Sequence, residues 1–225
     1  MRAEVVRSMF RAAGLLTGFA VFGGLLVAIT WESTEERIAE NERAFLLRSL
    51  ADVLPEGAYD NAVHEDFVTV TDAALLGTAA PVTVYRARLR NRPVGVVMTP
   101  VAPAGYSGPI RLLVGILADG TVSGVRVVAH RETPGLGDKI EVERDDWILR
   151  FAGRSLGQPP RERWAVRRDD GAFDQFTGAT ITARAVVSAV RDALIYFEAN
   201  RDALFAAPTG AAALPSPSSA GEGTE

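Results

Sequence analysis

The chain opens with a long apolar stretch. Residues 12–30 carry no charged side chain, and Trp31 follows directly. A helix rises about 1.5 Å per residue, so this stretch spans roughly 28 Å, close to the thickness of the hydrocarbon core of a bilayer. Tryptophan is typical of the interface between lipid and water. The pattern predicts a transmembrane helix over residues 12–31, preceded by a short cytoplasmic N-terminus of residues 1–11.

The charges on either side of this stretch predict its orientation. Arginines precede it and glutamates follow it: Arg2, Arg7 and Arg11, then Glu32, Glu35 and Glu36. A positively charged flank stays in the cytoplasm, which places the rest of the chain in the periplasm of a bacterium. A cleaved signal peptide is the alternative, but the run is longer than a typical signal sequence and AITWES offers no small-residue cleavage site. We therefore expect a single-pass anchor in the bacterial inner membrane, in contact with lipid.

The next segment, residues 32–67, begins with a helical pattern. Apolar residues recur on one helix face, and a proline stops the pattern: Ile38, Phe45, Leu46 and Leu50, then Pro55. This predicts a stalk helix followed by a linker.

From residue 68 the pattern becomes that of strands. Short segments rich in valine and isoleucine are separated by turn signals such as NRP and ADG: FVTVTDAALL, VTVYRARLR, PVGVVMTPVAP, IRLLVGIL and TVSGVRVVAH. They predict an antiparallel meander. Beyond it, RDDWILRFAG predicts a short helix, and RWAVRRDDGAFDQFTG predicts a hairpin around Asp170.

A final helix is expected from about Thr182 to Ala199, because valine, leucine and phenylalanine recur on one face. Residues 206–225 are small, polar and rich in proline and glycine, which predicts a disordered tail. Strands grouped together and flanked by helices are typical of the α+β class. We therefore predict a transmembrane helix, a stalk helix and an antiparallel-sheet domain with flanking helices over residues 68–205.

Composition narrows the possible chemistry. The net charge of −4 gives no reason to expect a nucleic-acid partner, whose binding surface is basic. The chain has no cysteine, which excludes disulfides, c-type haem attachment and cysteine-bound iron–sulfur clusters. With only two histidines, we expect no metal site. A redox role would require an organic cofactor.

The segment TGATIT, residues 177–182, lies at the predicted start of the last helix. Unpaired backbone N–H groups and the positive end of the helix dipole suit a phosphate there. Gly178 would let a ligand approach the backbone, and Thr180 and Thr182 offer hydroxyl groups. An ordinary threonine cap after a hairpin is the simpler explanation of the same residues. The phosphate loops of nucleotide-binding proteins and the serine-hydrolase elbow do not occur in the sequence.

Residues 174–180 read DQFTGAT and match the pattern D-x-x-[ST]-G-A-T. This resembles the site at which a bacterial flavin transferase attaches FMN, through its phosphate, to a threonine hydroxyl. The resemblance implies that Thr180 is the acceptor. The transferase would recognise the other residues of the motif: Asp174, Thr177, Gly178 and Ala179.

A second segment, residues 105–141, ends in HRETPGLGDKIE and resembles the FMN-binding domain of the G subunit of the Rnf electron-transport complex. The resemblance covers roughly residues 5–205. It implies an FMN-binding domain over residues 68–205. We expect the flavin ring to lie against residues 132–137, where glycines allow a close approach to the backbone and Pro134 and Leu136 could cover one face of the ring. The residues expected to contact the flavin without a covalent bond are Tyr106, Ser107, Glu132, Thr133, Leu136, Gly137, Lys139 and Thr182.

The family implies an electron-carrying subunit of an ion-translocating oxidoreductase, which couples electron transfer between ferredoxin and NAD to ion movement. It would act with the other Rnf subunits and turn over no substrate alone. The C subunit of the sodium-translocating NADH:quinone reductase is an alternative with the same covalent FMN. A membrane-anchored binding or scaffold domain without flavin is the alternative from another class.

Overall fold

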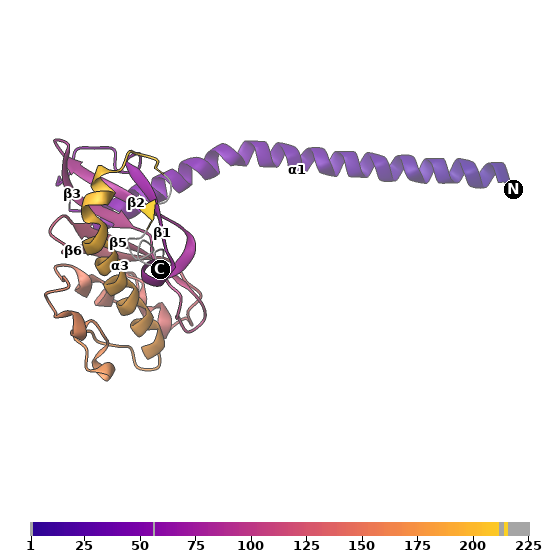
Figure 1. Ribbon diagram of the computed structural model, residues 1–225. Coiled ribbons are helices and arrows are strands. Elements are labelled where there is room, and N and C mark those ends of the chain that lie inside the picture. Colours follow the sequence, from indigo (N-terminus) through magenta and orange to yellow (C-terminus); the bar gives the residue numbers. More distant parts are fainter. Residues whose placement is uncertain (1, 56, 212–213, 216–225) are drawn as a thin grey trace, which may run out of the picture. The chain divides into compact units, whose positions relative to one another are not determined.

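The computed structural model describes residues 2–55, 57–211 and 214–215, with side chains described at only some positions before residue 46. The chain divides into two compact units, Met1–Leu46 and Leu47–Glu225. Helix α1, Arg2–Val53, runs through the first unit and into the second (Figure 1). It ends two residues before Pro55, so the predicted stalk continues the same helix as the apolar segment.

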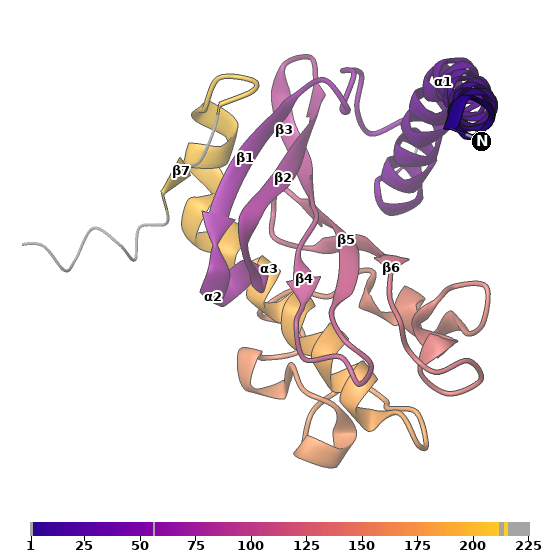
Figure 2. The same ribbon diagram turned by 90° about the vertical axis from the view of Figure 1, so that its right-hand side faces the viewer.

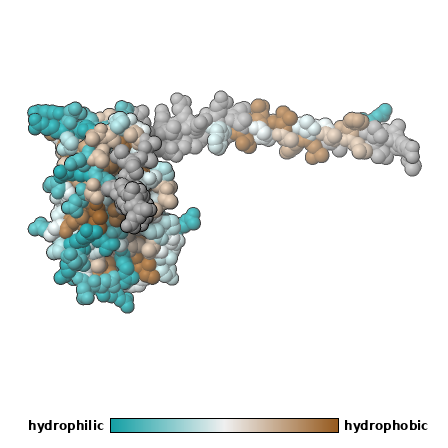
Figure 3. Space-filling model, viewed as in Figure 1, coloured by the Kyte–Doolittle hydropathy of each residue, from teal (hydrophilic) through white to brown (hydrophobic). Residues whose placement is uncertain are grey.

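Within α1, the segment Met9–Val27 is long and apolar enough to cross a membrane. Its large side chains that are described, such as Phe19 at 81% exposed, have no protein packed against them. Figure 3 shows apolar residues along this part of the helix. The protein is therefore membrane-anchored through one N-terminal helix, a few residues earlier in the sequence than the predicted span.

The second unit is built on an antiparallel sheet. Its strands are β1 Phe67–Asp72, β2 Thr78–Leu89, β3 Arg92–Met98, β4 Val101–Ala102, β5 Ile110–Leu117 and β6 Val122–Ala129. Strands β1, β2, β3, β5 and β6 pair in chain order. The short strand β4 also pairs with β5, on the same edge as β3. The predicted antiparallel meander and the α+β class are confirmed.

One predicted strand is partly wrong. The segment FVTVTDAALL contains β1 and then a one-turn helix, α2 Ala73–Leu76. Asp72 begins this helix, because its carboxylate accepts hydrogen bonds from the backbone N–H groups of Ala74 and Leu75 at 3.1 and 2.9 Å. Gly77, with φ of 69°, ends it.

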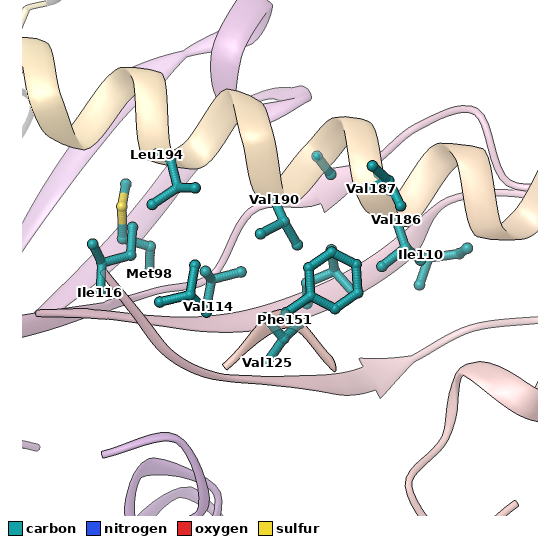
Figure 4. Packing of buried hydrophobic residues seen from close by; sticks show 14 of the residues in the cluster. Met98, Ile110, Val114, Ile116, Val125, Phe151, Val186, Val187, Val190 and Leu194 are labelled. Atoms are coloured by element: carbon teal, nitrogen blue, oxygen red, sulfur yellow. The ribbon is translucent and has the colours of Figure 1, made fainter. Parts of the chain in front are cut away.

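Helix α3, Thr180–Ala206, lies across one face of the sheet (Figure 2) and is longer at both ends than the predicted helix. Its apolar side chains meet those of β3 and β5, as Figure 4 shows. The labelled residues of this buried cluster are Met98, Ile110, Val114, Ile116, Val125, Phe151, Val186, Val187, Val190 and Leu194. This packing fixes the start of α3 against the loops at one end of the sheet.

Short 3₁₀ helices connect β6 to α3: η1 Gly137–Ile140, η2 Asp146–Phe151, η3 Arg161–Arg163 and η4 Arg167–Asp169. The short helix predicted for RDDWILRFAG is η2. The hairpin predicted around Asp170 is wrong, since η4 and a left-handed Asp170 occupy its place. An isolated parallel bridge joins Val166 to Phe173, and Gly171, directly after the left-handed Asp170, packs on the backbone of Ala165.

The far face of the sheet carries the C-terminal turn of α1. Gly115 of β5 and Gly124 of β6 are paired, and both lie against Val53. A side chain at Gly115 would collide with the Val53 carbonyl oxygen, which accepts a hydrogen bond from the Ser123 hydroxyl. These two glycines form a seat, which we call the glycine seat, for the end of α1.

The opposite end of α3 is held by a buried arginine. Arg86 of β2 is 1% exposed and pairs with Asp66. Its guanidinium also donates to the carbonyl oxygens of Leu204 and Ala207 at 3.0 and 2.5 Å and to the Thr209 hydroxyl at 2.9 Å. Burial raises the pKa of Asp66, but hydrogen bonds from Arg88 and Arg86 outweigh it and leave the pKa below its ordinary value.

These contacts correct the prediction that the chain is disordered from residue 206 onwards. Thr209 lies in the predicted tail of residues 206–225, yet it takes part in the arginine network. A two-residue strand, β7 Leu214–Pro215, pairs in parallel with β1. The tail therefore begins against the sheet, and its residues 212–213 and 216–225 lie outside the described part of the chain.

Candidate functional site

Thr180 is the first residue of α3. Ala179 precedes it as the N-cap residue and has no side-chain atom that could accept a hydrogen bond from the helix. Thr180 is therefore not the N-cap residue of α3, as the alternative explanation of the motif as an ordinary threonine cap would require. It lies, half-buried, beside the positive end of the longest helix of the second unit.

The turn before this helix contacts a loop distant in sequence. Gly178 has a φ of 84°, a left-handed conformation that suits glycine. A Cβ at Gly178 would lie 3.4 Å from Cδ2 of Leu136. The two segments that carry the sequence motifs, TGAT and the loop after His130, are thus in contact.

Glu132 joins three segments at this place, and we call these contacts the Glu132 junction. The side chain is buried, 5% exposed, although glutamate is rarely so. Oε1 accepts a hydrogen bond from the backbone N–H of Ser107 at 2.9 Å, and Oε2 accepts one from the Thr182 hydroxyl. The junction holds the loop around Ser107, the loop after β6 and the first turn of α3 together.

Two glycines allow this junction to close. A Cβ at Gly137 would lie 2.8 Å from Cβ of Glu132, and one at Gly105 would lie 2.2 Å from the Gly108 carbonyl oxygen and 3.0 Å from Oε1 of Glu132. The distances of 2.8 and 2.2 Å are too short for ordinary packing, so a side chain at either position would force its neighbours to move.

His130 supports the junction from behind. Its Nδ1 accepts a hydrogen bond from the backbone N–H of Glu132 at 3.0 Å, and its Nε2 lies 2.8 Å from Oε1 of Glu141. Since Nδ1 is the acceptor, Nε2 carries the proton and donates to Glu141. The sequence pattern predicts only that His130 ends a strand, and it does directly follow β6.

Around the junction, several large side chains face solvent. Tyr106 is 68% exposed, Leu136 44% and Ile181 45%. Tyr106 precedes Ser107 in the junction, Leu136 contacts Gly178, and Ile181 is the second residue of α3. Exposed apolar side chains next to a helix N-terminus suit a ligand with a flat apolar ring and a phosphate.

The remaining predicted contacts line the same loop. The Thr133 carbonyl accepts hydrogen bonds from the N–H groups of Leu136 and Gly137 at 3.1 and 3.0 Å, which closes a turn. Lys139 is exposed on η1 directly after this turn. The predicted residues therefore come from neighbouring segments, although neither Thr133 nor Lys139 takes part in the junction itself.

Asp174 lies between two arginines that sequence reasoning does not connect to it. Arg150 Nη1 is 2.6 Å from one carboxylate oxygen of Asp174, and Arg167 Nε is 3.0 Å from the other. The indole N–H of Trp147 donates to the Asp174 carbonyl oxygen at 2.8 Å. The only signal in the sequence is that Trp147 and Arg150 are three residues apart within the predicted short helix.

Two family models match the chain. The family model described as the FMN-binding domain matches residues 105–195, and the one described as the RnfG N-terminal region matches residues 1–53. The N-terminal match favours the Rnf branch over the quinone-reductase alternative.

Curated relatives match most of the chain, and each is named as the G subunit of an ion-translocating oxidoreductase complex. The protein of Pseudomonas aeruginosa is 51% identical over 206 residues, covering 92% of this chain and 96% of its own length. The protein of Pseudoalteromonas atlantica is 48% identical over 193 residues, covering 86% and 90%. That of Shewanella loihica is 45% identical over 202 residues, covering 90% and 95%. The chain belongs to this G-subunit family of the ion-translocating oxidoreductase complex.

Proposed function

We propose that this protein is the flavin-carrying electron-transfer subunit of a membrane-bound ion-translocating oxidoreductase, with FMN joined by a phosphoester to Thr180. The observation that carries the proposal is the position of Thr180. Its hydroxyl is at the first residue of α3, on the segment next to Leu136 and two residues before Thr182 of the Glu132 junction.

The residues present fit this cofactor. A phosphate bonded to the Thr180 hydroxyl would be at the N-terminus of α3, where backbone N–H groups and the helix dipole stabilise negative charge. Forming the phosphoester needs a flavin donor whose phosphate carries a leaving group, which departs as the hydroxyl loses its proton. This reaction belongs to a separate flavin transferase, which is a partner during maturation.

The protein's own residues would orient the flavin. Tyr106 and Leu136 would offer apolar surface to a ring, and Ser107, Thr133 and Gly137 belong to the same two loops. Lys139 supplies a nearby positive charge. Glu132 and Thr182 hold these segments in place through the junction. FMN, when attached, supplies one-electron and two-electron redox chemistry.

The complex would provide the remaining functions. The apolar segment of α1 carries no charge between residues 12 and 30, so this subunit has no group there to carry an ion. We propose that it passes electrons to cofactors on the other Rnf subunits, that it lies in the bacterial inner membrane, and that its FMN-binding domain faces the periplasm.

The test is covalent flavin on the full-length protein. After co-expression with a flavin transferase, the denatured wild-type band should fluoresce under ultraviolet light, and peptide mapping should place the FMN mass on Thr180. Thr180→Ala should give a dark band while remaining folded. Thr177→Ala removes an exposed hydroxyl of the recognition motif, so it should slow the modification, but the flavin that is incorporated should still map to Thr180.

Two outcomes would contradict the proposal. A dark wild-type band, with the transferase active on a known substrate, would return the protein to the class of anchored domains without flavin. A fluorescent Thr180→Ala band, or flavin mapped to Thr177, would show that another residue is the acceptor.

A further inference from the structure

The segment before Thr180 is held by one short helix. Trp147 and Phe151 of η2 contact Phe176 and Phe173, with ring centroids 5.0 and 4.8 Å apart. Phe173 and Phe176 are both buried. They anchor the segment on either side of Asp174.

Asp174 is bound by the same helix. A 3₁₀ helix has three residues per turn, so Trp147 and Arg150 lie on the same face. Trp147 binds the backbone of Asp174 and Arg150 binds its carboxylate. Arg167 of η4 binds the other carboxylate oxygen at 3.0 Å.

The geometry suggests an indirect role for Asp174. Each of its carboxylate oxygens already has an arginine of this chain, and its side chain is 37% exposed. The two arginines thus occupy part of the surface at which a transferase could bind this carboxylate directly. Holding the segment between η2, η4 and α3 is a role that the carboxylate fulfils through the contacts seen in the structure.

We propose that Arg150 and Arg167 are positioning residues for the modification of Thr180. They fix Asp174 and thereby keep the acceptor segment in the conformation that leads into α3. The transferase then recognises a folded surface that includes the η2 face, beyond the linear motif of residues 174–180. This inference rests on the proposed function, because it concerns the same acceptor.

The effect should fall on the modification and not on folding. The two arginines are 51% and 67% exposed. Exposed ion pairs contribute little to global stability. A segment that is ordered only part of the time presents the acceptor only part of the time, so a competent fraction of about a tenth slows the reaction about tenfold.

The test compares initial rates of flavin incorporation into full-length protein, with limiting transferase, by in-gel fluorescence and intact mass. The variants are Asp174→Asn, the double variant Arg150→Gln with Arg167→Gln, and the triple combination of all three. We expect about tenfold slower incorporation in the first two, and no further slowing in the triple variant because all three changes break the same contacts.

Arg201→Gln, which removes an exposed arginine paired with Asp202 far along α3, is the matched control and should behave as wild type.

A conservative double variant keeps the test decisive. Arg150→Lys with Arg167→Lys retains both charges and should recover most of the rate, with a melting temperature like that of the glutamine variant. If the glutamine double variant is modified at the wild-type rate, the inference is wrong. It is also wrong if the losses multiply in the triple variant, because Asp174 then acts without the arginines. A wild-type protein that acquires no flavin would overturn the proposed function, whereas these two results leave that function intact.

Discussion

Glu132 is a carboxylate whose two oxygens bind groups from two other segments of the chain. The Ser107 N–H and the Thr182 hydroxyl both donate to it, and its own N–H donates to His130. A buried donor that loses its acceptor bears its full desolvation cost, so such a residue influences both the fold and the shape of the proposed flavin site.

We predict that Glu132→Ala lowers the free energy of unfolding by about 2–4 kcal/mol, because two donors lose a charged acceptor. Glu132→Gln, which keeps one acceptor oxygen, should lose less. Urea denaturation of the detergent-solubilised protein measures both. Glu143→Ala, an exposed glutamate of the following segment, is the control and should be close to wild type. Equal stability of Glu132→Ala and Glu143→Ala would show that the junction does not hold these segments together.

Asp66 predicts how stability changes with pH. Its pKa is lower in the folded protein than the ordinary value of 3.8, since its hydrogen bonds with Arg88 and Arg86 outweigh the effect of burial. The stabilisation is therefore fully present above that ordinary value and is lost as the pH falls through the folded pKa. Asp66→Asn should be less stable than wild type near neutral pH, and the difference should shrink in acid.

Denaturant unfolding at a series of pH values from about 3 to 7 checks this prediction. Asp202→Asn is the control, because its carboxylate is 97% exposed and only 3.5 Å from a neighbouring arginine. It should show no pH-dependent difference from wild type. A constant gap between Asp66→Asn and wild type across the range would contradict the linkage.

At the scale of elements, the glycine seat joins the end of α1 to the sheet. Leu50 and Val53 are 2% and 1% exposed there, and the Ser123 hydroxyl binds the last carbonyl group of the helix. The end of α1 can approach the backbone of β5 and β6 this closely because Gly115 and Gly124 are directly paired and neither has a side chain.

Gly115→Ala should destabilise the protein by about 1–3 kcal/mol, which is the usual cost of overpacking. Replacing a strand glycine by alanine otherwise favours folding slightly through chain entropy, so the sign depends on the collision with Val53. Urea denaturation gives the change, and amide hydrogen exchange should show faster opening of residues 50–54. Gly157→Ala is the control, since the nearest atom to its new Cβ is 3.9 Å away. A neutral or stabilising Gly115→Ala would mean that the helix end is not seated on these strands.

The same scale shows what sequence patterns can predict. Alternating valines predicted the antiparallel strands because burial of one face imposes a period of two. The pattern failed at Asp170, where a glycine packed on Ala165 decides the backbone path, and at Ala73, where the Asp72 cap decides it. The turn at Asp170 and the helix at Ala73 each depend on a local contact, which does not show in the periodicity of the sequence.

For the candidate site too, the sequence predicted some residues, whereas others are seen only in the structure. Thr180 and the loop after His130 were predicted from a family resemblance, and their contact through Leu136 is seen only in three dimensions. The arginines that bind Asp174 come from η2 and η4, segments predicted as an ordinary helix and a hairpin. No spacing in the sequence connects them to the motif.

For the whole molecule, the asymmetric charges flanking the apolar segment predict the side of the membrane. Protease added to spheroplasts should digest the FMN-binding domain, and the same protease added to inverted vesicles should leave it intact. A cytoplasmic protein inside the spheroplasts must stay undigested as the control. Protection in spheroplasts together with digestion in inverted vesicles would reverse the assigned orientation.

The glycine seat also determines where the protein can be cut for work in solution. A soluble form that starts at Pro55 would remove Leu50, Val53 and Leu54, which are buried residues of the second unit. The surface of β5 and β6 that Val53 covers at Gly115 and Gly124 would then face water, and a newly exposed apolar patch favours aggregation. A form that starts at Leu47 keeps the patch covered and leaves out the apolar segment Met9–Val27. The last turn of the membrane helix is therefore needed for the solubility of the domain that it anchors.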